Sequence, residues 1–101
     1  MRKLEFSAHA DRDMDQVFDY TVDQWGFEQA FRYSDELIAV ITKLGEFPHL
    51  GIDRSDLQDR LRCLVVARHV VWYRVFAERV LVSRVLHERE DAVTALVDVN
   101  Y

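Results

Sequence analysis

The feature that most constrains this chain is a change in hydrophobic period at about residue 59. Before it, apolar residues recur every three or four positions, which is the spacing of amphipathic helices. After it come three short segments rich in Val, Leu, Trp, Tyr and Phe, each of strand length. We therefore expect helices packed on a sheet. The length of 101 residues predicts a single domain over residues 1–101.

The first half of the chain predicts a strand and two helices. Residues 3–7 alternate as a short strand does, and the hydroxyl of Ser7 can cap the helix that follows. Gly26 ends that helix, and a second helix runs from there to about Gly45. Two helices joined by one glycine must fold back as a hairpin. Their apolar faces contain Ala10, Met14, Val17, Phe18, Thr21 and Trp25 in the first, and Phe27, Ala30, Phe31, Ser34, Leu37, Ile38, Ile41 and Leu44 in the second.

The second half predicts three antiparallel strands at residues 60–67, 69–76 and 80–86, after a loop at 46–59. The order is β-α-α-β-β-β, an α+β fold with a helical hairpin packed on a mostly antiparallel sheet. Tight turns fix the register, which sets Cys63 opposite Trp72 and Trp72 opposite Arg84.

This register divides the strand residues between two faces. One face contains Leu61, Cys63, Val65, Val70, Trp72, Arg74, Val82 and Arg84, and the other contains Arg62, Leu64, Val66, His69, Val71, Tyr73, Val85 and His87. Both faces are largely apolar, so both need a cover. We expect the helical hairpin on one face, and the tail from residue 91 or a partner on the other.

Charge is distributed unevenly. The net charge of −5 argues against a general nucleic-acid-binding protein, because phosphate contacts need basic surface. Residues 10–45 carry eight acidic and three basic residues, whereas residues 54–91 carry six acidic residues and eight basic ones, all arginine. This asymmetry predicts a charged partner.

Metal, cofactor and membrane binding find no support in the sequence. Cys63 is the single cysteine, and its strand position places it on the face opposite His69 and His87. The aspartates at 11, 13 and 15 lack the glycine and glutamate of a calcium loop and instead favour a helix start. We expect no metal, no cofactor and no membrane span, and a cytoplasmic location.

Five motifs in order then carry a family resemblance. They are Ala10-Asp11-Arg12-Asp13-Met14, Tyr20-Thr21 with Trp25-Gly26-x-x-Gln29-Ala30, Pro48-x-x-Gly51, Arg62 with His69-Val70-Val71-Trp72-Tyr73-Arg74, and the segment from Arg84 to Asp91. Over residues 4–96 the chain resembles the ParE branch of the RelE/ParE toxin superfamily. The turn at Ala67-Arg68 departs from the Gly or Ser that is usual there.

The resemblance implies a toxin of a type II toxin–antitoxin pair, of the kind that stabilises plasmids. It also implies that the toxin acts by binding DNA gyrase, without catalysis, and is neutralised by a ParD-like antitoxin. The ribonuclease branch, resembling RelE, carries Lys, Lys and Arg where this chain has Leu61, Cys63 and Val70. Apolar or neutral side chains cannot stabilise charge on a scissile phosphate.

Two alternatives stay open at this point. One is a RelE-like, ribosome-dependent mRNA interferase that uses His69, His87 and nearby arginines. The other is a non-toxic member of the fold that only binds an antitoxin. Two histidines closing the end of the sheet favour a structural role over general acid–base catalysis.

The expected contact residues lie on the last two strands. We expect Trp72, Arg74 and Arg84 to contact an acidic antitoxin segment, because arginine forms forked hydrogen bonds to carboxylates. We expect Arg84, His87 and Arg89 to contact the target. The alternative is that these arginines are solvated or paired strand residues, and that Trp25 and Trp72 are core anchors.

Overall fold

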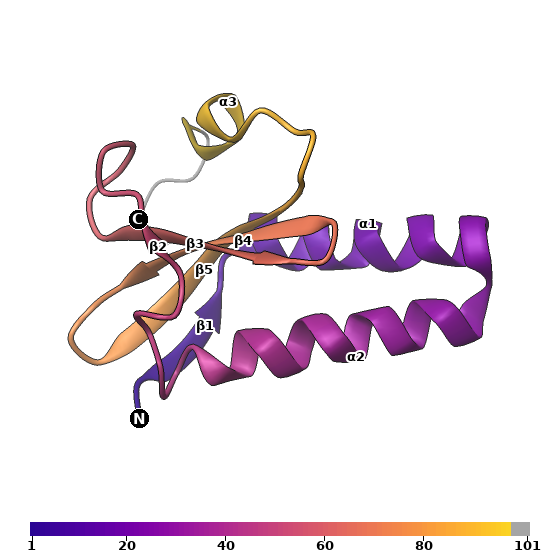
Figure 1. The fold of residues 1–101 in the computed structure, drawn as a ribbon, viewed down its shortest axis with the longest axis horizontal. Coiled ribbons are helices and arrows are strands. Elements are labelled where there is room, and N and C mark those ends of the chain that lie inside the picture. The colour runs from indigo at the N-terminus through magenta and orange to yellow at the C-terminus, as the bar shows by residue number, and fades with distance from the viewer. Residues whose placement is uncertain (98–101) are drawn as a thin grey trace.

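A computed structural model describes residues 1–97 (Figure 1). Its elements are β1 (Lys3–Phe6), α1 (Ala8–Trp25), α2 (Phe27–Lys43), β2 (Ile52–Asp53), β3 (Leu61–Val66), β4 (His69–Val75), β5 (Arg79–His87) and α3 (Ala92–Val97). The predicted order of a strand, two helices and three strands is confirmed. The short strand β2, inside the segment predicted as loop, was missed because two residues carry no detectable period.

The sheet has the strand order β1-β5-β4-β3-β2. β1 runs parallel to β5, and every other pair is antiparallel. The predicted register is confirmed at both positions, with Cys63 opposite Trp72 and Trp72 opposite Arg84. The two-residue turn between β3 and β4 places Ala67 at φ 53°. Glycine would adopt this left-handed conformation with less strain.

A β-bulge in β5 corrects one assignment. Tyr73 pairs with Val82 and Trp72 pairs with Arg84, so Ser83 is an extra residue without a partner in β4. The extra residue reverses the alternation, and Val82 faces the helices together with Tyr73. Its predicted place on the face of Trp72 was wrong, because a constant register cannot represent a bulge.

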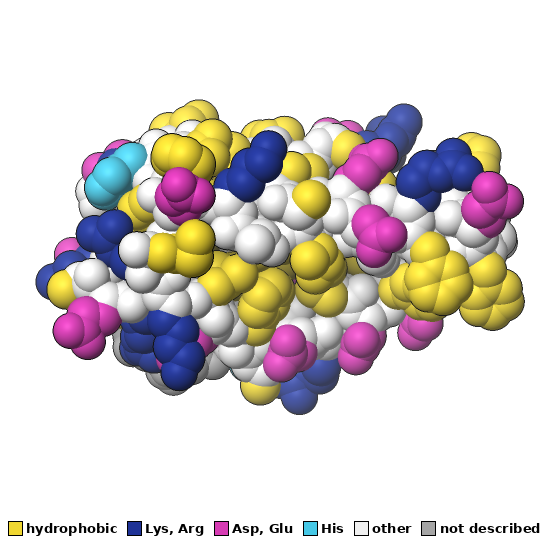
Figure 2. Space-filling model, turned by 90° about the horizontal axis from the view of Figure 1, so that it is seen from below, with side chains coloured by type: hydrophobic (Ala, Val, Ile, Leu, Met, Phe, Trp, Pro, Cys, Tyr) yellow, Lys and Arg dark blue, Asp and Glu magenta, His cyan; other side chains and the backbone are white. Residues whose placement is uncertain are grey.

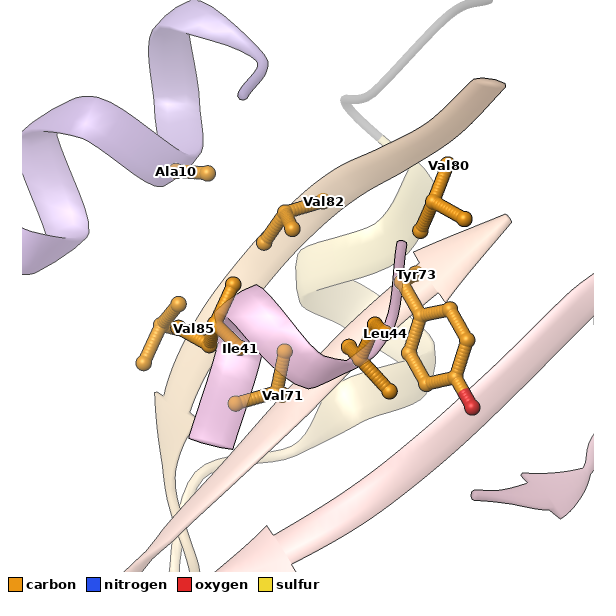
Figure 3. Close-up of a cluster of buried hydrophobic side chains, with 8 residues drawn as sticks. All are labelled: Ala10, Ile41, Leu44, Val71, Tyr73, Val80, Val82 and Val85. Carbon is orange, nitrogen blue, oxygen red and sulfur yellow. The ribbon is translucent and has the colours of Figure 1, made fainter. Parts of the chain in front are cut away.

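The helical hairpin covers one face of the sheet and forms the main core (Figure 3). The buried side chains of this core are Ala10 from α1, Ile41 and Leu44 from α2, Val71 and Tyr73 from β4, and Val80, Val82 and Val85 from β5. Helix α3 lies on the opposite side of the sheet from α2 (Figure 1). There Leu96 packs against Leu61, Cys63, Trp72 and Leu86, which confirms that the tail covers the second face.

The hairpin extends past the sheet, so its far end has no layer to pack against (Figure 1). Trp25 is 74% exposed and Phe27 is 66% exposed. Phe31 is also exposed and meets Phe18 edge-on at 5.1 Å between ring centroids. The expectation that Trp25 is a core anchor was wrong, because helical spacing shows where apolar residues lie but not how far the sheet reaches.

Ser7 fastens the start of α1 to the bulge. Its hydroxyl accepts a hydrogen bond from Ala10 N at 3.0 Å, as predicted for a helix cap. The same hydroxyl donates to Ser83 O at 2.7 Å, and the backbone N of Ser7 donates to Val82 O at 2.9 Å. The first helix therefore begins where β1 leaves the edge of β5.

Tyr73 fastens the long loop to the sheet. Its buried hydroxyl donates to Pro48 O and accepts from Gly51 N, both at 2.8 Å. Gly51 is required there, because a Cβ would lie 2.5 Å from Cys63 O and 2.6 Å from the Tyr73 hydroxyl. This contact explains why the Pro48-x-x-Gly51 motif accompanies a tyrosine in β4.

Candidate functional site

The predicted contact residues fall into three places. Trp72 and Arg84 are cross-strand neighbours on the face beneath α3. Arg74 lies further along β4, toward the β4–β5 turn, and His87 and Arg89 lie at the other end of β5. The structure therefore brings together Trp72 with Arg84, but does not form one cluster of all five residues.

Trp72 is buried in the core, which agrees with the alternative that it is a core anchor. Its side chain is 5% exposed and packs with Leu86 and Leu96. The guanidinium carbon of Arg54 lies 5.6 Å from its ring centroid, a cation–π contact at the rim. A partner segment can contact this ring only if α3 is displaced from it.

Arg84 forms a forked ion pair with Asp13 of α1. Its Nε and Nη2 donate to the two carboxylate oxygens at 2.7 and 2.9 Å, and its Nη1 donates to Ala95 O at 3.2 Å. Asp13 also accepts from Val85 N at 2.9 Å. Because the side chains of Arg84 and Asp13 are 16% and 7% exposed, the pair is largely shielded from water.

Asp13 was interpreted from sequence only as a helix-start acid, so its partner was missed. A signal was present: Asp13 stands three residues after Ala10 and four before Val17, on the buried face of α1. An acid on an apolar face needs a cation or several hydrogen-bond donors. The structure supplies both, and Arg84 thereby joins α1, β5 and α3.

Three aromatic or imidazole rings meet where α2 passes the end of the sheet. His69 and His87 are cross-strand neighbours, as predicted, with ring centroids 5.4 Å apart. The Tyr33 hydroxyl and His69 Nδ1 are 2.6 Å apart. Burial lowers the pKa of His69, and the adjacent His87 lowers it further, while Glu90 and Glu88 oppose that shift. Burial also raises the pKa of Tyr33.

Two adjoining cavities form a groove along α1 at this point. One, of about 360 Å³, extends toward Trp25 and Tyr33, and the other, of about 420 Å³, extends toward Asp13 and Glu90. Tyr20, His69 and His87 line both. The groove therefore runs from the apolar tip of the hairpin to the Asp13–Arg84 pair, and Tyr20 and Tyr33 are site residues that sequence reasoning missed.

The segment after β5 is held by short-range contacts. The backbone N of His87 donates to Glu90 Oε1 at 3.0 Å, and the backbone N of Arg89 donates to His87 Nδ1 at 3.2 Å. Arg89 is exposed. Within residues 1–97, no ion pair joins Arg89 to Glu90 or Asp91, and the turn that carries Arg89 is locally ordered.

Comparison with known proteins decides the family. A family model described as "ParE toxin of type II toxin-antitoxin system, parDE" matches residues 4–92. The chain is 37% identical over 92 residues to Toxin ParE1 of Caulobacter vibrioides, covering 91% of this chain and 95% of that protein. It is 34% identical over 86 residues to Toxin ParE1 of Mycobacterium tuberculosis, covering 84% of this chain and 88% of that protein.

This chain belongs to the ParE toxin family. It is accordingly a toxin component of a type II toxin–antitoxin system, and the predicted family is confirmed. The fold is confirmed independently by a solved structure described as "Chromosomal ParDE TA system from P. aeruginosa". That chain superimposes with a TM-score of 0.76 at 20% identity, covering 86% of this chain and 96% of that one.

In this ParE-family chain, the three positions compared above with the ribonuclease branch are apolar or neutral and lie in the cluster covered by α3. Leu61 and Cys63 are buried, and Val70 packs against the same cluster. Burial raises the pKa of the Cys63 thiol, so the neutral form is favoured. Within the described residues, no group of three His, Cys, Asp or Glu side chains could hold a metal, and no helix is long and apolar enough to span a bilayer.

The buried ion pair predicts a large effect from a small change. Asp13→Ala should lower the free energy of unfolding by about 3 kcal/mol, because it leaves the Arg84 guanidinium without its counter-charge. The double variant Asp13→Leu with Arg84→Met should cost less than Asp13→Ala alone, because it removes both charges. Urea unfolding measures both. A cost below 1 kcal/mol for Asp13→Ala would show that water compensates Arg84.

The lowered pKa of His69 predicts a pH-dependent stability. The folded state favours the neutral ring, so its contribution is complete above the unfolded pKa of about 6.5 and is lost as the pH falls toward the lower folded pKa. Urea midpoints should therefore drop between pH 7.5 and pH 5.5. His69→Gln should reduce that drop, whereas His49→Gln in the exposed loop should not. Equal drops in both variants would contradict the assignment to His69.

Proposed function

We propose that this toxin acts by binding DNA gyrase, without chemistry of its own, and that a ParD-like antitoxin neutralises it. Family membership supports a toxin of a type II system. The observation that carries the non-catalytic part is the apolar sheet face under α3. A ribonuclease of this fold needs basic side chains at positions that Leu61 and Cys63 fill here, buried against Leu96.

The surface that we assign to the target is the edge of the molecule at the end of β5. His87 and Arg89 are held on an ordered turn beside the groove, and Arg89 is exposed. Arg84 belongs to the same region through Asp13, which lines the groove. We assign target contact to Arg89 and His87, with Arg84 supporting them through the ion pair.

The groove along α1 also suits an antitoxin segment that folds as it binds. Its apolar end is formed by exposed rings at the hairpin tip, and burying such rings offsets the cost of ordering a disordered segment. Arg84 lies near the other end of the groove, and Trp72 and Arg74 follow on the α3 face. We propose that acidic antitoxin groups approach Arg84 and Arg74, and that Trp72 is reached where the segment displaces α3.

The first test separates gyrase binding from ribonuclease action. Purified toxin should inhibit DNA supercoiling by gyrase and leave linear DNA after denaturation of the reaction, because a stabilised cleavage complex holds broken strands. Adding the antitoxin should restore supercoiling. Messages from cells expressing the toxin alone should remain intact in primer extension.

Two results would reject this function. Codon-dependent mRNA cleavage in translating ribosomes, with normal supercoiling, would identify the RelE-like interferase. Unimpaired growth together with tight antitoxin binding would identify a non-toxic member of the fold.

The second test addresses the contact residues. His87→Ala with Arg89→Ala should leave the melting temperature within a few degrees, because Arg89 is exposed and surface contacts contribute under about 1 kcal/mol each. The same variant should lose growth inhibition and gyrase inhibition while it still binds the antitoxin. His87 lines the groove, but its truncation leaves the groove open and leaves Arg84, Arg74 and the rings of the hairpin tip in place.

A matched control replaces another half-buried histidine and exposed arginine, His9→Ala with Arg12→Ala on α1. This control should stay toxic. Full toxicity of the His87 and Arg89 variant would mean that the segment is structural and that the target contacts lie elsewhere.

A further inference from the structure

Three guanidinium groups surround one ring at the β4–β5 turn. The guanidinium carbons of Arg79, Arg74 and Arg60 lie 4.8, 5.2 and 5.5 Å from the centroid of Phe76. These arginines come from three different places in the chain, and the ring restricts where each planar group can lie. The result is a preorganised cluster of cations in a protein of net charge −5.

A cavity of about 350 Å³ opens beside this ring. Arg2, Arg60 and Arg62 line it, together with His49. Arg2 Nε donates to Phe76 O at 2.9 Å, and Arg62 Nη1 donates to Gly51 O at 2.7 Å. Each guanidinium carries five N–H groups, so one backbone contact fixes the side chain and leaves donors directed elsewhere. Over residues 1–97 neither Arg2 nor Arg62 forms an ion pair.

Acidic groups near the cluster reduce its charge but do not cancel it in the cavity. Arg79 pairs with Glu5 at 2.8 Å, and Arg60 lies 3.7 Å from the Asp59 carboxylate. Glu78 is exposed in the turn itself. These pairs are partly or largely solvated and therefore weak. The cavity wall itself contains three arginines against one carboxylate, that of Asp53.

The geometry points to this cavity as a binding site for the backbone phosphates of double-stranded DNA. Forked guanidinium donors match phosphate oxygens, and backbone contacts need no apolar anchor or base-reading element. An acidic peptide would need apolar anchors to bind stably. The larger apolar side chains of the cavity wall, Leu61, Val75 and Phe76, are buried or half-buried. Exposed apolar side chains of the neighbouring loop, such as Phe47, Leu50 and Ile52, lie outside that wall.

The two ends of the molecule suit two simultaneous contacts. The longest dimension is 39 Å, with the β4–β5 turn at one end and the hairpin tip at the other (Figure 1). Large apolar side chains gather at the tip end in Figure 2, whereas Lys and Arg side chains lie at both ends of that face. This inference rests on the proposed function in one respect: gyrase holds DNA, so a toxin bound to gyrase meets DNA at a high effective concentration.

The test measures DNA binding without gyrase. A short fluorescein-labelled duplex is titrated with the toxin at several salt concentrations and followed by fluorescence anisotropy. Three neutralised phosphates predict a slope of about −2.7 in log affinity against log salt. Arg60→Gln with Arg62→Gln should weaken binding at low salt about tenfold or more and bring the slope to about −0.9. Arg60→Lys with Arg62→Lys should retain most of the affinity.

The control is Arg12→Gln with Arg32→Gln, which removes the same charge from exposed positions on the two helices. It should leave both slope and affinity close to those of the unaltered protein. Equal losses in both double variants, or no salt-dependent binding by the unaltered protein, would overturn the inference. Unchanged DNA binding with weakened antitoxin binding in the Arg60 and Arg62 variant would assign these two arginines, like Arg74, to the antitoxin and also overturn the inference.

The same variants in the supercoiling assay separate this inference from the proposed function. Inhibition by the unaltered toxin together with full inhibition by a DNA-binding-deficient variant would reject a role for DNA contact while leaving gyrase as the target. DNA binding lost in the variant, with no inhibition by the unaltered toxin, would keep the site and reject gyrase.

Discussion

The Asp13–Arg84 ion pair connects the three layers of this molecule: the helical hairpin, the sheet and helix α3. The Arg84 side chain extends from β5, binds the carboxylate of Asp13 on α1, and donates to Ala95 O on α3. The same carboxylate accepts from Val85 N, in the part of β5 beyond β1. A carboxylate on a helix thus satisfies a donor that a neighbouring strand would otherwise satisfy. Because water is largely excluded, both partners must be present together.

The bulge at Ser83 makes the Asp13–Arg84 ion pair possible. One extra residue lets Val82 and Val85 both face the helices while Arg84 stands opposite Trp72. The register of Cys63 and Trp72 could be predicted, because two-residue turns determine the pairing of the strands they join. The bulge could not, because it is set by tertiary contacts from Ser7 to the backbone of Val82 and Ser83. Local pattern contains no information about such contacts.

The candidate site shows the same division between local and tertiary information. His69 and His87 could be placed side by side from turn positions alone, whereas Tyr33 belongs to a helix whose rotation above the sheet the sequence does not define. Trp25 illustrates the opposite error. An apolar residue at helical spacing predicts a buried face, yet burial requires a second layer, and the hairpin extends beyond the last strand. Exposed rings there are the expected result of a long hairpin on a short sheet.

The distribution of burial also favours a protein that acts by contact. Helix α3 and the hairpin cover both faces of the sheet, so Leu61 and Cys63 are buried and offer no charge to a phosphate. What remains accessible is the perimeter: the aromatic tip, the groove along α1, the turn that carries Arg89, and the arginines around Phe76. A perimeter of separate small patches is poorly suited to holding one scissile bond among several catalytic groups, which must be positioned together. It is well suited to joining different macromolecules at different edges, since each patch adds affinity to a complex that another patch has already formed.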